Sequence, residues 1–363
     1  MTRNMKKIVL YAPRFFGIDE AIRDAFIQLG FEVVLKNTRS KVTIQEAISR
    51  KAINIFPSTK RILSPILKYY LAEENRDFTA TLQREKPDLL FIIKGHQLFP
   101  QTLEIFKRET STPIVAYQWD DPFYSHLGQY TDEYRRTNFE KGMKYYDYIF
   151  VYDPYHVEEI KKRGHRNVGY LPLATDPKNF TPIDHVKKGD DKYDYDVCFV
   201  GVPHANRVEV LDAIKNYKLG VFGTGWKKYF LLRGKRVPKY YQGQASGDDV
   251  IDIYRASRIT LNIHDPQATE GVNTRTFDVL ACGARELVDY KKALEDHFII
   301  GEEIAVYRNI DELKELVETY VNDTDLLERI SQRGKQRVLE EHSWVQRMAS
   351  VISTLRDKRI FAR

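Results

Sequence analysis

One stretch in the C-terminal half of the chain combines residue types that could bind a nucleoside diphosphate. In chain order these residues are Glu270, Asn273, Thr274, Arg275 and Asp278. A short polar side chain at Asn273 or Thr274 can accept hydrogen bonds from the free amides of a first helical turn. Those amides and Arg275 suit phosphate oxygens, and Asp278 can accept hydrogen bonds from two ribose hydroxyls. The alternative is an ordinary strand–loop–helix unit with Arg275 and Asp278 paired on its surface.

The segments around this stretch predict how its polar groups are positioned. An apolar strand at 259–264 precedes it, and a second strand at 286–289 follows it. Phe277 and Leu280 are three residues apart, so one face of the short helix points inward. Gly283 stands where a left-handed residue usually ends a helix. We therefore expect a strand, a loop and a capped helix that presents its first turn to a ligand.

Strands and helices alternate in two series along the chain, which predicts an α/β fold with two domains. The short β–α–β crossovers indicate parallel sheets. We expect an N-terminal domain at residues 1–180 and a C-terminal domain at residues 193–343, separated by a polar linker at 182–194. A last helix at about 344–363 is expected to return to the N-terminal domain.

Residues that follow the predicted strands are further site candidates, because ligands of open α/β sheets bind at the carboxyl ends of the strands. These candidates are His96, Asp120 and Asp121 in the N-terminal half, and Gly201, Gly223, Gly225 and Trp226 in the C-terminal half. Glycines let the backbone approach a ligand closely, so Gly223, Gly225 and Trp226 are expected to shape a nucleobase pocket. His96 could instead be a satisfied core histidine, and Asp120-Asp121 a turn with an Asx cap.

Composition narrows the class of protein. The chain has 363 residues, with 57 basic against 51 acidic side chains and a formal net charge of +6. This modest balance does not favour a nucleic-acid partner, which usually needs a concentrated basic face. Cys198 and Cys282 stand in apolar contexts, and no His/Cys cluster has the spacing of a metal site. The polar start of the chain and the lack of a long apolar run predict a cytoplasmic protein.

The helical region 49–70 is basic and amphipathic. Such a region could dock peripherally on an anionic membrane surface, at the inner face of the membrane. The alternative is a solvated helix of a soluble domain, which is how such patterns more often arise.

Several motifs resemble those of the CgeB-like, spore-maturation-type glycosyltransferases of the two-Rossmann-domain (GT-B) architecture. They are Cys198–Gly201, Arg207, Phe222–Trp226, Leu261–His264, Val272–Ala284 and Glu341–Trp344. The resemblance implies two Rossmann-like domains that face a central cleft. It also implies transfer of a sugar from a UDP-, GDP- or dTDP-linked donor to a glycan, polysaccharide, lipid-linked or protein acceptor, with no metal or other cofactor.

The spacing of Glu270 and Asp278 resembles the paired carboxylates of family-4 retaining glycosyltransferases. That resemblance implies that Asp278 holds the ribose, that Glu270 reaches the transferred sugar, and that Arg207 meets the diphosphate. If the enzyme inverts, Asp120 or Asp121 is expected to be the general base. If it retains, these groups would position the acceptor. A nucleotide-sugar epimerase and a non-catalytic nucleotide-sugar-binding protein of the same architecture remain the alternatives.

Overall fold

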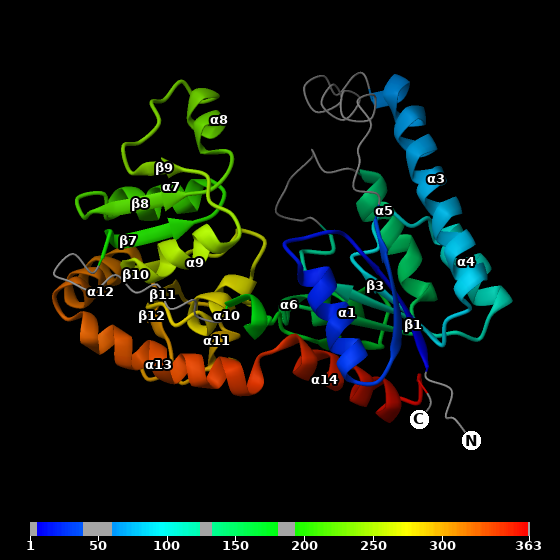
Figure 1. The fold of residues 1–363 in the computed structure, drawn as a ribbon. Coiled ribbons are helices and arrows are strands. Elements are labelled where there is room, and N and C mark those ends of the chain that lie inside the picture. Colours follow the sequence, from blue (N-terminus) through cyan, green and yellow to red (C-terminus); the bar gives the residue numbers. More distant parts are fainter. Residues whose placement is uncertain (1–5, 39–59, 124–132, 181–192, 362–363) are drawn as a thin grey trace. The chain divides into compact units, whose positions relative to one another are not determined.

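The computed structural model describes residues 6–38, 60–123, 133–180 and 193–361 (Figure 1). Its internal contacts divide the chain into two compact units. The first unit holds residues 1–172 and 344–363, and the second holds residues 173–343. Residues 173–180, which the sequence placed in the N-terminal domain, therefore belong to the second unit. Most of the expected linker at 182–194 lies outside the described residues.

The first unit is built on a parallel sheet with the strand order β2-β1-β3-β4-β5-β6. Its strands are β1 (Lys7–Ala12), β2 (Glu32–Asn37), β3 (Leu89–Ile93), β4 (Ile114–Gln118), β5 (Tyr148–Val151) and β6 (Val168–Tyr170). The described helices are α1 (Ile18–Gln28), α3 (Lys60–Glu85), α4 (Pro100–Glu109), α5 (Glu133–Gly142), α6 (Tyr155–Lys162) and α14 (Trp344–Asp357). Strands β3 and β4 are buried along their whole length, as apolar runs between two helical layers should be.

The strand order of the first unit reverses between β1 and β3, because β2 lies on the outer side of β1 and the chain then returns to the other side. This reversal places the loops after β1 and β3 at a topological switch point, where ligands of such sheets bind. Helix α14 covers this unit by packing on α1, and Phe361 beyond it lies 6.0 Å from the ring centre of Phe31.

The second unit has a parallel sheet with the order β12-β11-β10-β7-β8-β9, whose switch point lies between β7 and β10. Its strands are β7 (Tyr195–Val200), β8 (Leu219–Phe222), β9 (Tyr241–Gly243), β10 (Ser257–Asn262), β11 (Glu286–Asp289) and β12 (Ala305–Tyr307). Its α-helices are α7 (Ala205–Ala213), α8 (Trp226–Leu231), α9 (Asp248–Arg255), α10 (Thr274–Ala281), α11 (Leu294–His297), α12 (Ile310–Asn322) and α13 (Thr324–Glu341). The two six-stranded parallel sheets confirm the predicted pair of Rossmann-like domains.

The basic region 49–70 is described only in part. Residues 49–59 lie outside the described residues, and the remainder forms the start of α3. None of the helices in the described part of the chain is both long and apolar enough to cross a membrane.

Candidate functional site

Helix α10 forms as the sequence predicted, at the carboxyl end of β10. Asn273 is its cap, because its side-chain oxygen accepts a hydrogen bond of 3.1 Å from the amide of Thr276. Thr274, the other predicted cap, is the first helical residue. Phe277 and Leu280 are fully buried, so the inward face is also confirmed. The first turn of α10 thus stands at the switch point of the second sheet, with the dipole of the helix favouring negative charge there.

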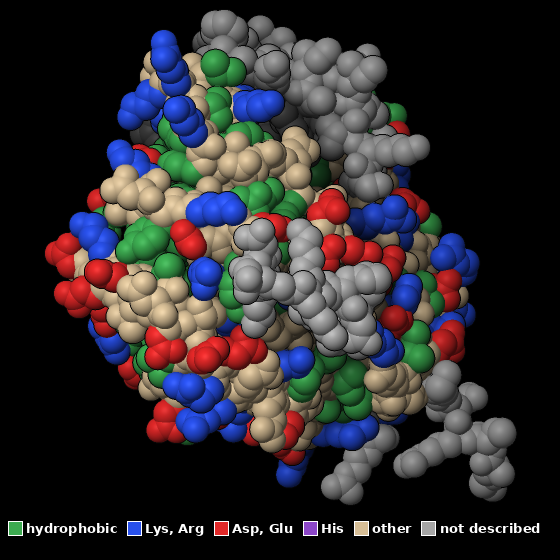
Figure 2. All heavy atoms as spheres, turned by 60° about the vertical axis from the view of Figure 1, so that its left-hand side comes forward, with side chains coloured by type: hydrophobic (Ala, Val, Ile, Leu, Met, Phe, Trp, Pro, Cys, Tyr) green, Lys and Arg blue, Asp and Glu red, His purple; other side chains and the backbone are tan. Residues whose placement is uncertain are grey.

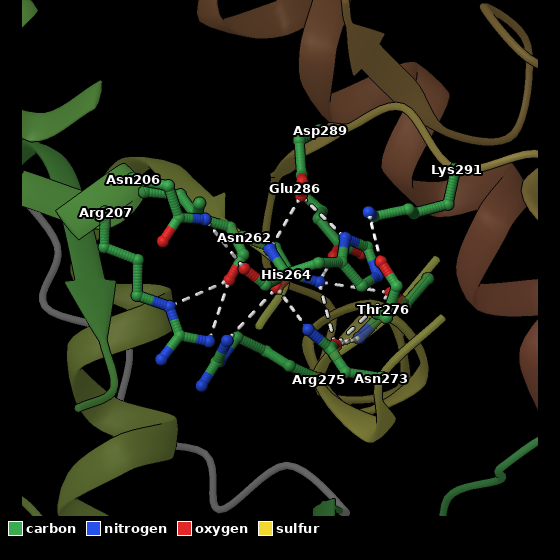
Figure 3. Close-up of polar contacts among 12 residues, drawn as sticks. Asn206, Arg207, Asn262, His264, Asn273, Arg275, Thr276, Glu286, Asp289 and Lys291 are labelled. Carbon is green, nitrogen blue, oxygen red and sulfur yellow. Dashed lines mark hydrogen bonds and ion pairs between the residues drawn. The ribbon is translucent and has the colours of Figure 1, made fainter. Parts of the chain in front are cut away.

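A buried amide, Asn262, holds this helix start in place (Figure 3). Its Nδ2 lies 3.2 Å from Asn273 Oδ1 and 2.8 Å from Glu286 Oε1. Its Oδ1 accepts a hydrogen bond of 3.1 Å from Arg275 Nη1. Asn262 and Glu286 are both fully buried, and burial raises the pKa of Glu286 well above its ordinary value. Sequence reasoning missed both residues, although a polar side chain inside an apolar strand is the signal that could have found them.

Two guanidinium groups come together beside this network. Arg207 is buried and donates to the carbonyl oxygens of Val202, at 2.9 Å, and Ile263, at 3.0 Å. Arg207 and Arg275 lie 5.5 and 5.4 Å from the ring centre of Phe199. Burial, together with the charge of Arg275, lowers the pKa of Arg207 to about 10. Among the described residues, neither guanidinium forms an ion pair within 4.0 Å, although Asp265 and Asp289 act on Arg207, and Asp278 and Glu286 interact with Arg275, over longer distances.

The glycines after β7 and β8 are required by close packing. A Cβ at Gly223, where φ is +129°, would lie 2.3 Å from the carbonyl oxygen of Gly201. A Cβ at Gly201 would lie 3.1 Å from Nη2 of Arg275. Gly225 has a φ of +88° and precedes the first residue of α8. The backbone therefore passes close to the guanidinium of Arg275 at Gly201, and close to itself at Gly223, because side chains are absent there.

The structure contradicts the predicted role of Trp226. The sequence suggested that it helps to shape a nucleobase pocket, but its ring is fully buried in the core of the second unit. Its Nε1 donates a hydrogen bond of 2.7 Å to the carbonyl oxygen of Gly201. Through this hydrogen bond Trp226 holds the loop after β7. Its ring has no exposed surface for a ligand.

The start of α7 is tied to the end of β10 across the switch point. Asn206 Nδ2 donates to the carbonyl oxygen of His264, at 3.3 Å, and His204 Nε2 lies 2.9 Å from Asp265 Oδ2. Burial alone would raise the pKa of Asp265, but the hydrogen bonds from His204 and the amide of Gln267, together with the charge of Arg207, lower it to about 2. Together with the contacts of Arg207, these pairs hold both sides of the switch point in one geometry.

The two predicted carboxylates of the second unit differ in their surroundings. Asp278, half-buried on α10, accepts a hydrogen bond of 2.7 Å from the hydroxyl of Thr175, and burial raises its pKa to about 7. The alternative surface pair of Arg275 with Asp278 is not formed within 4.0 Å in the described structure. Glu270 lies in the loop before α10, with Oε1 3.7 Å from Lys292 Nζ.

The candidates of the first unit lie after β3 and β4, on neighbouring strands, but only Asp120 reaches solvent appreciably. Its side chain is 25% exposed and pairs with Lys94. Asp121 is buried, and its Oδ1 accepts a hydrogen bond of 2.8 Å from the amide of Phe123 and lies 3.3 Å from Nε2 of His156. Asp121 therefore fits the alternative of a turn with an Asx cap.

His96 is also buried, with its Nε2 3.4 Å from the carbonyl oxygen of Pro122. Its burial fits the alternative of a core histidine. Neither His96 nor Asp121 has the exposure that proton transfer with a bound acceptor would need in this conformation. Of the three candidates in the first unit, Asp120 is the one whose position suits contact with a ligand.

An aromatic wall adjoins Asp120. Phe15, which follows β1, is 44% exposed and lies 5.8 Å from the ring centre of Trp119, while Lys94 Nζ lies 5.7 Å from that of Phe15. Phe16 and Lys94 have positive φ values of 47° and 65°, which side-chain-bearing residues rarely adopt. Such strained residues cluster at functional sites. The loops after β1, β3 and β4 thus form a second candidate site, within the first unit.

No group of three or more His, Cys, Asp or Glu side chains in the described parts of the chain is arranged to hold a metal ion. Cys198 and Cys282 are both buried free thiols, as their apolar contexts predicted.

Comparison with known proteins decides the class to which this site belongs. Residues 206–353 match a family model described as glycosyl transferase-like. The spore protein CgeB of Bacillus subtilis (strain 168) is 22% identical over 252 residues, which cover 65% of this chain and 73% of that protein. This chain is a glycosyltransferase similar to CgeB. The predicted resemblance and the predicted enzyme class are thereby confirmed.

Solved structures extend the likeness to the whole chain. Sucrose-phosphate synthase from Thermosynechococcus elongatus matches the glycosyltransferase with a TM-score of 0.69 at 13% identity, over 97% of this chain and 100% of that one. HepE from Anabaena, in complex with UDP-glucose, matches with a TM-score of 0.65 at 10% identity, over 96% and 99% of the two chains. At such low identity these matches establish the fold, which is the GT-B architecture.

Proposed function

We propose that the second unit of this glycosyltransferase binds a nucleoside-diphosphate sugar as the donor. The observation that carries the proposal is the pair of guanidiniums, Arg207 and Arg275, beside the ring of Phe199. Like charges so close together are unfavourable, and here no carboxylate of the described structure pairs with them. An anion with several oxygens, such as a diphosphate, would balance both charges and also accept hydrogen bonds from the amides of α10.

The other predicted residues fit the rest of such a donor. Asp278 is half-buried and would accept hydrogen bonds from the two ribose hydroxyls. These would replace the hydrogen bond that Asp278 accepts from the hydroxyl of Thr175. Glu270 would reach the transferred sugar, as the resemblance implies. The structure of HepE contains UDP-glucose, which supports a uridine donor as the first to test, ahead of guanosine and thymidine donors.

In the reaction, the bond between the anomeric carbon and the diphosphate oxygen breaks, and a bond to an acceptor hydroxyl oxygen forms. The departing diphosphate gains negative charge, which Arg207, Arg275 and the start of α10 are placed to stabilise electrostatically. We propose that these groups take the role that a metal ion has in other transferases. The acceptor hydroxyl loses its proton either to a carboxylate, if the configuration inverts, or to the departing phosphate oxygen, if it is retained.

We further propose that the loops after β1, β3 and β4 bind the acceptor. Asp120 would be the general base of an inverting reaction or would position the acceptor in a retaining one. The exposed ring of Phe15 suits the flat face of a sugar, so a glycan is the first acceptor to test. Because cells make nucleotide sugars in the cytoplasm, we place the reaction there.

A ligand screen tests the donor proposal. The melting temperature of the whole chain should rise with UDP or a UDP-sugar, since a ligand stabilises the folded state in proportion to the logarithm of its concentration over its dissociation constant. Incubation with labelled nucleotide sugars and a glycan panel should then show label in the glycan fraction. If no nucleoside diphosphate raises the melting temperature at millimolar concentration, the donor site is misassigned. Interconversion of free nucleotide sugars without any acceptor would instead indicate an epimerase.

A further inference from the structure

One segment of the second unit has a charge pattern unlike the rest of the chain. It comprises α8 and the loop from α8 to β9, and we call the surface of its residues 227–239 the α8 surface. Its basic residues are Lys227, Lys228, Arg233, Lys235, Arg236 and Lys239. From Trp226 to Gly247 the sequence has no Asp or Glu. The whole chain is nearly balanced in charge, so this segment concentrates as much positive charge as the chain carries net.

The six cations are exposed to solvent and are not neutralised locally. None of them takes part in an ion pair within the described residues, whereas exposed cations elsewhere in this unit do, such as Arg308 with Glu312. Arg233 lies over the ring of Tyr229, 3.7 Å from its centre, and donates to the carbonyl oxygen of that residue. The cations of the α8 surface are therefore available to anionic groups outside the protein.

Two adjacent leucines project among these cations. Leu231 is 70% exposed and Leu232 is 73% exposed, while Trp226 and Phe230 of the same helix are buried in the core. Apart from Phe16, no other large apolar side chain of the described structure is as exposed. Figure 2 shows Lys and Arg side chains, with hydrophobic ones among them, at the end of the molecule where Figure 1 places α8.

We propose that the α8 surface docks on an anionic lipid bilayer. Leu231 and Leu232 would enter the boundary between headgroups and acyl chains, and the surrounding cations would contact the anionic headgroups. A nucleic acid would satisfy the cations but would leave the two leucines in water, so the pattern favours a bilayer. This proposal does not depend on the donor site. It also concerns a different segment from the region 49–70, which the sequence alone suggested for membrane contact.

Sedimentation of the whole protein with vesicles tests the proposal. The protein should sediment with vesicles of phosphatidylcholine mixed with phosphatidylglycerol, and remain in the supernatant with phosphatidylcholine alone. Since each cation near an anionic surface contributes appreciably to binding, reversal of two charges in Lys235→Glu/Arg236→Glu should lower the partition coefficient by at least about tenfold. Leu231→Ser/Leu232→Ser should lower it as well, even at low salt, where the charges act most strongly.

Matched variants on another helix of the same unit provide the control. Arg329→Glu/Arg333→Glu on α13 changes the net charge by the same amount, and Leu339→Ser removes a partly exposed leucine. Both should sediment with anionic vesicles as the unchanged protein does. All variants should keep the melting temperature of the unchanged protein, which separates loss of docking from loss of folding.

Three outcomes would overturn the proposal. The first is that the unchanged protein does not sediment with the anionic vesicles. The second is that the α13 variant loses binding as much as the α8 variants, because net charge alone would then explain the result. The third is that the protein binds a short duplex RNA in a gel-shift assay at moderate salt but does not sediment with the vesicles.

Discussion

The two units are built on similar parallel sheets, yet the side chains that follow their strands differ in how they are paired. In the first unit, Asp120 pairs with Lys94 and Asp121 contacts His156. In the second unit, Arg207 and Arg275 lie beside one ring with no carboxylate of the described structure within 4.0 Å. The first unit thus pairs Asp120 and Asp121 with neighbouring side chains, whereas two guanidiniums of the second unit have no such short ion pair in the described structure.

The charges at the strand ends suit the two units to different partners. A site with unbalanced cations at a helix start favours an anionic ligand, as a nucleoside diphosphate is. A site of paired charges beside aromatic rings, such as that of Phe15 and Trp119, suits a neutral, hydroxyl-rich ligand instead. The shared fold does not determine this division, because the side chains at the strand ends do.

The largest effect is expected at Asp121, whose carboxyl group is buried. Asp121→Ala should lower the free energy of unfolding by about 4 kcal/mol, because it removes the acceptor of the buried Phe123 amide and the polar neighbour of the buried His156 ring, at about 1–3 kcal/mol for each. Urea denaturation followed by circular dichroism measures this loss. Asp120→Ala, at a partly exposed pair, should lose less than about 1 kcal/mol.

Asp121→Asn then distinguishes a structural from a catalytic role. The Asn side chain keeps an oxygen acceptor, so most of the stability and the turnover should remain. A variant that keeps its melting temperature but loses turnover a hundredfold would show that Asp121 takes part in catalysis after all.

The second prediction concerns the cations of the second unit. Arg275→Ala should weaken nucleoside-diphosphate binding by about 3 kcal/mol, since it removes a charge-assisted hydrogen-bond donor from a partly buried site. Isothermal titration calorimetry with UDP measures the change. Arg308→Ala, an exposed cation of the same unit, is the control and should bind UDP normally. Equal affinity in the Arg275 variant and the control would remove the basis for the donor assignment.

The third prediction sharpens the position of the ribose. Asp278→Ala should weaken UDP binding by about 2 kcal/mol, because two hydroxyl contacts to a carboxylate are lost. The deoxyribose analogue, which lacks one of the two hydroxyls, should show a smaller loss on the same substitution. If the ribo and deoxyribo nucleotides lose equal affinity, Asp278 does not contact the diol.

The smallest expected effect is on the pH dependence of stability. The pKa of Asp278 is about 7 in the folded protein and 3.8 ordinarily, so the folded state holds a proton that the unfolded chain releases in this window. The stability that this group contributes should therefore fall as the pH rises from about 4 through the folded pKa near 7, and level off about one pH unit above it. We expect a slope below about 1 kcal/mol per pH unit, because the carboxyl is only half-buried. Asp278→Asn should flatten the melting temperature across this range, and an unchanged profile would contradict the raised pKa.

The sequence predicted those parts of the fold and the site that depend on neighbouring residues. The alternation of strands and helices predicted two parallel sheets, and the pair Asn273 and Thr274 predicted the start of α10, because capping depends on residues three positions apart. The glycines at 201 and 223 were also recognisable, since they stand at the ends of short apolar runs. Each of these features follows from local propensity or spacing.

The remaining features arise where the sheets bring distant residues together. The hydrogen bond from Thr175 to Asp278 joins positions 103 residues apart, and the contact of Asn262 with Glu286 joins neighbouring strands. The contact that makes Asp121 structural depends on where α6 places His156. Burial likewise appears only after packing, so the sequence could not separate Trp226, which is inside, from Leu231 and Leu232, which are outside. Residue types and their spacing thus determined the elements and the kind of chemistry, whereas strand order and packing decided which of the charged groups are neutralised and which remain for a ligand.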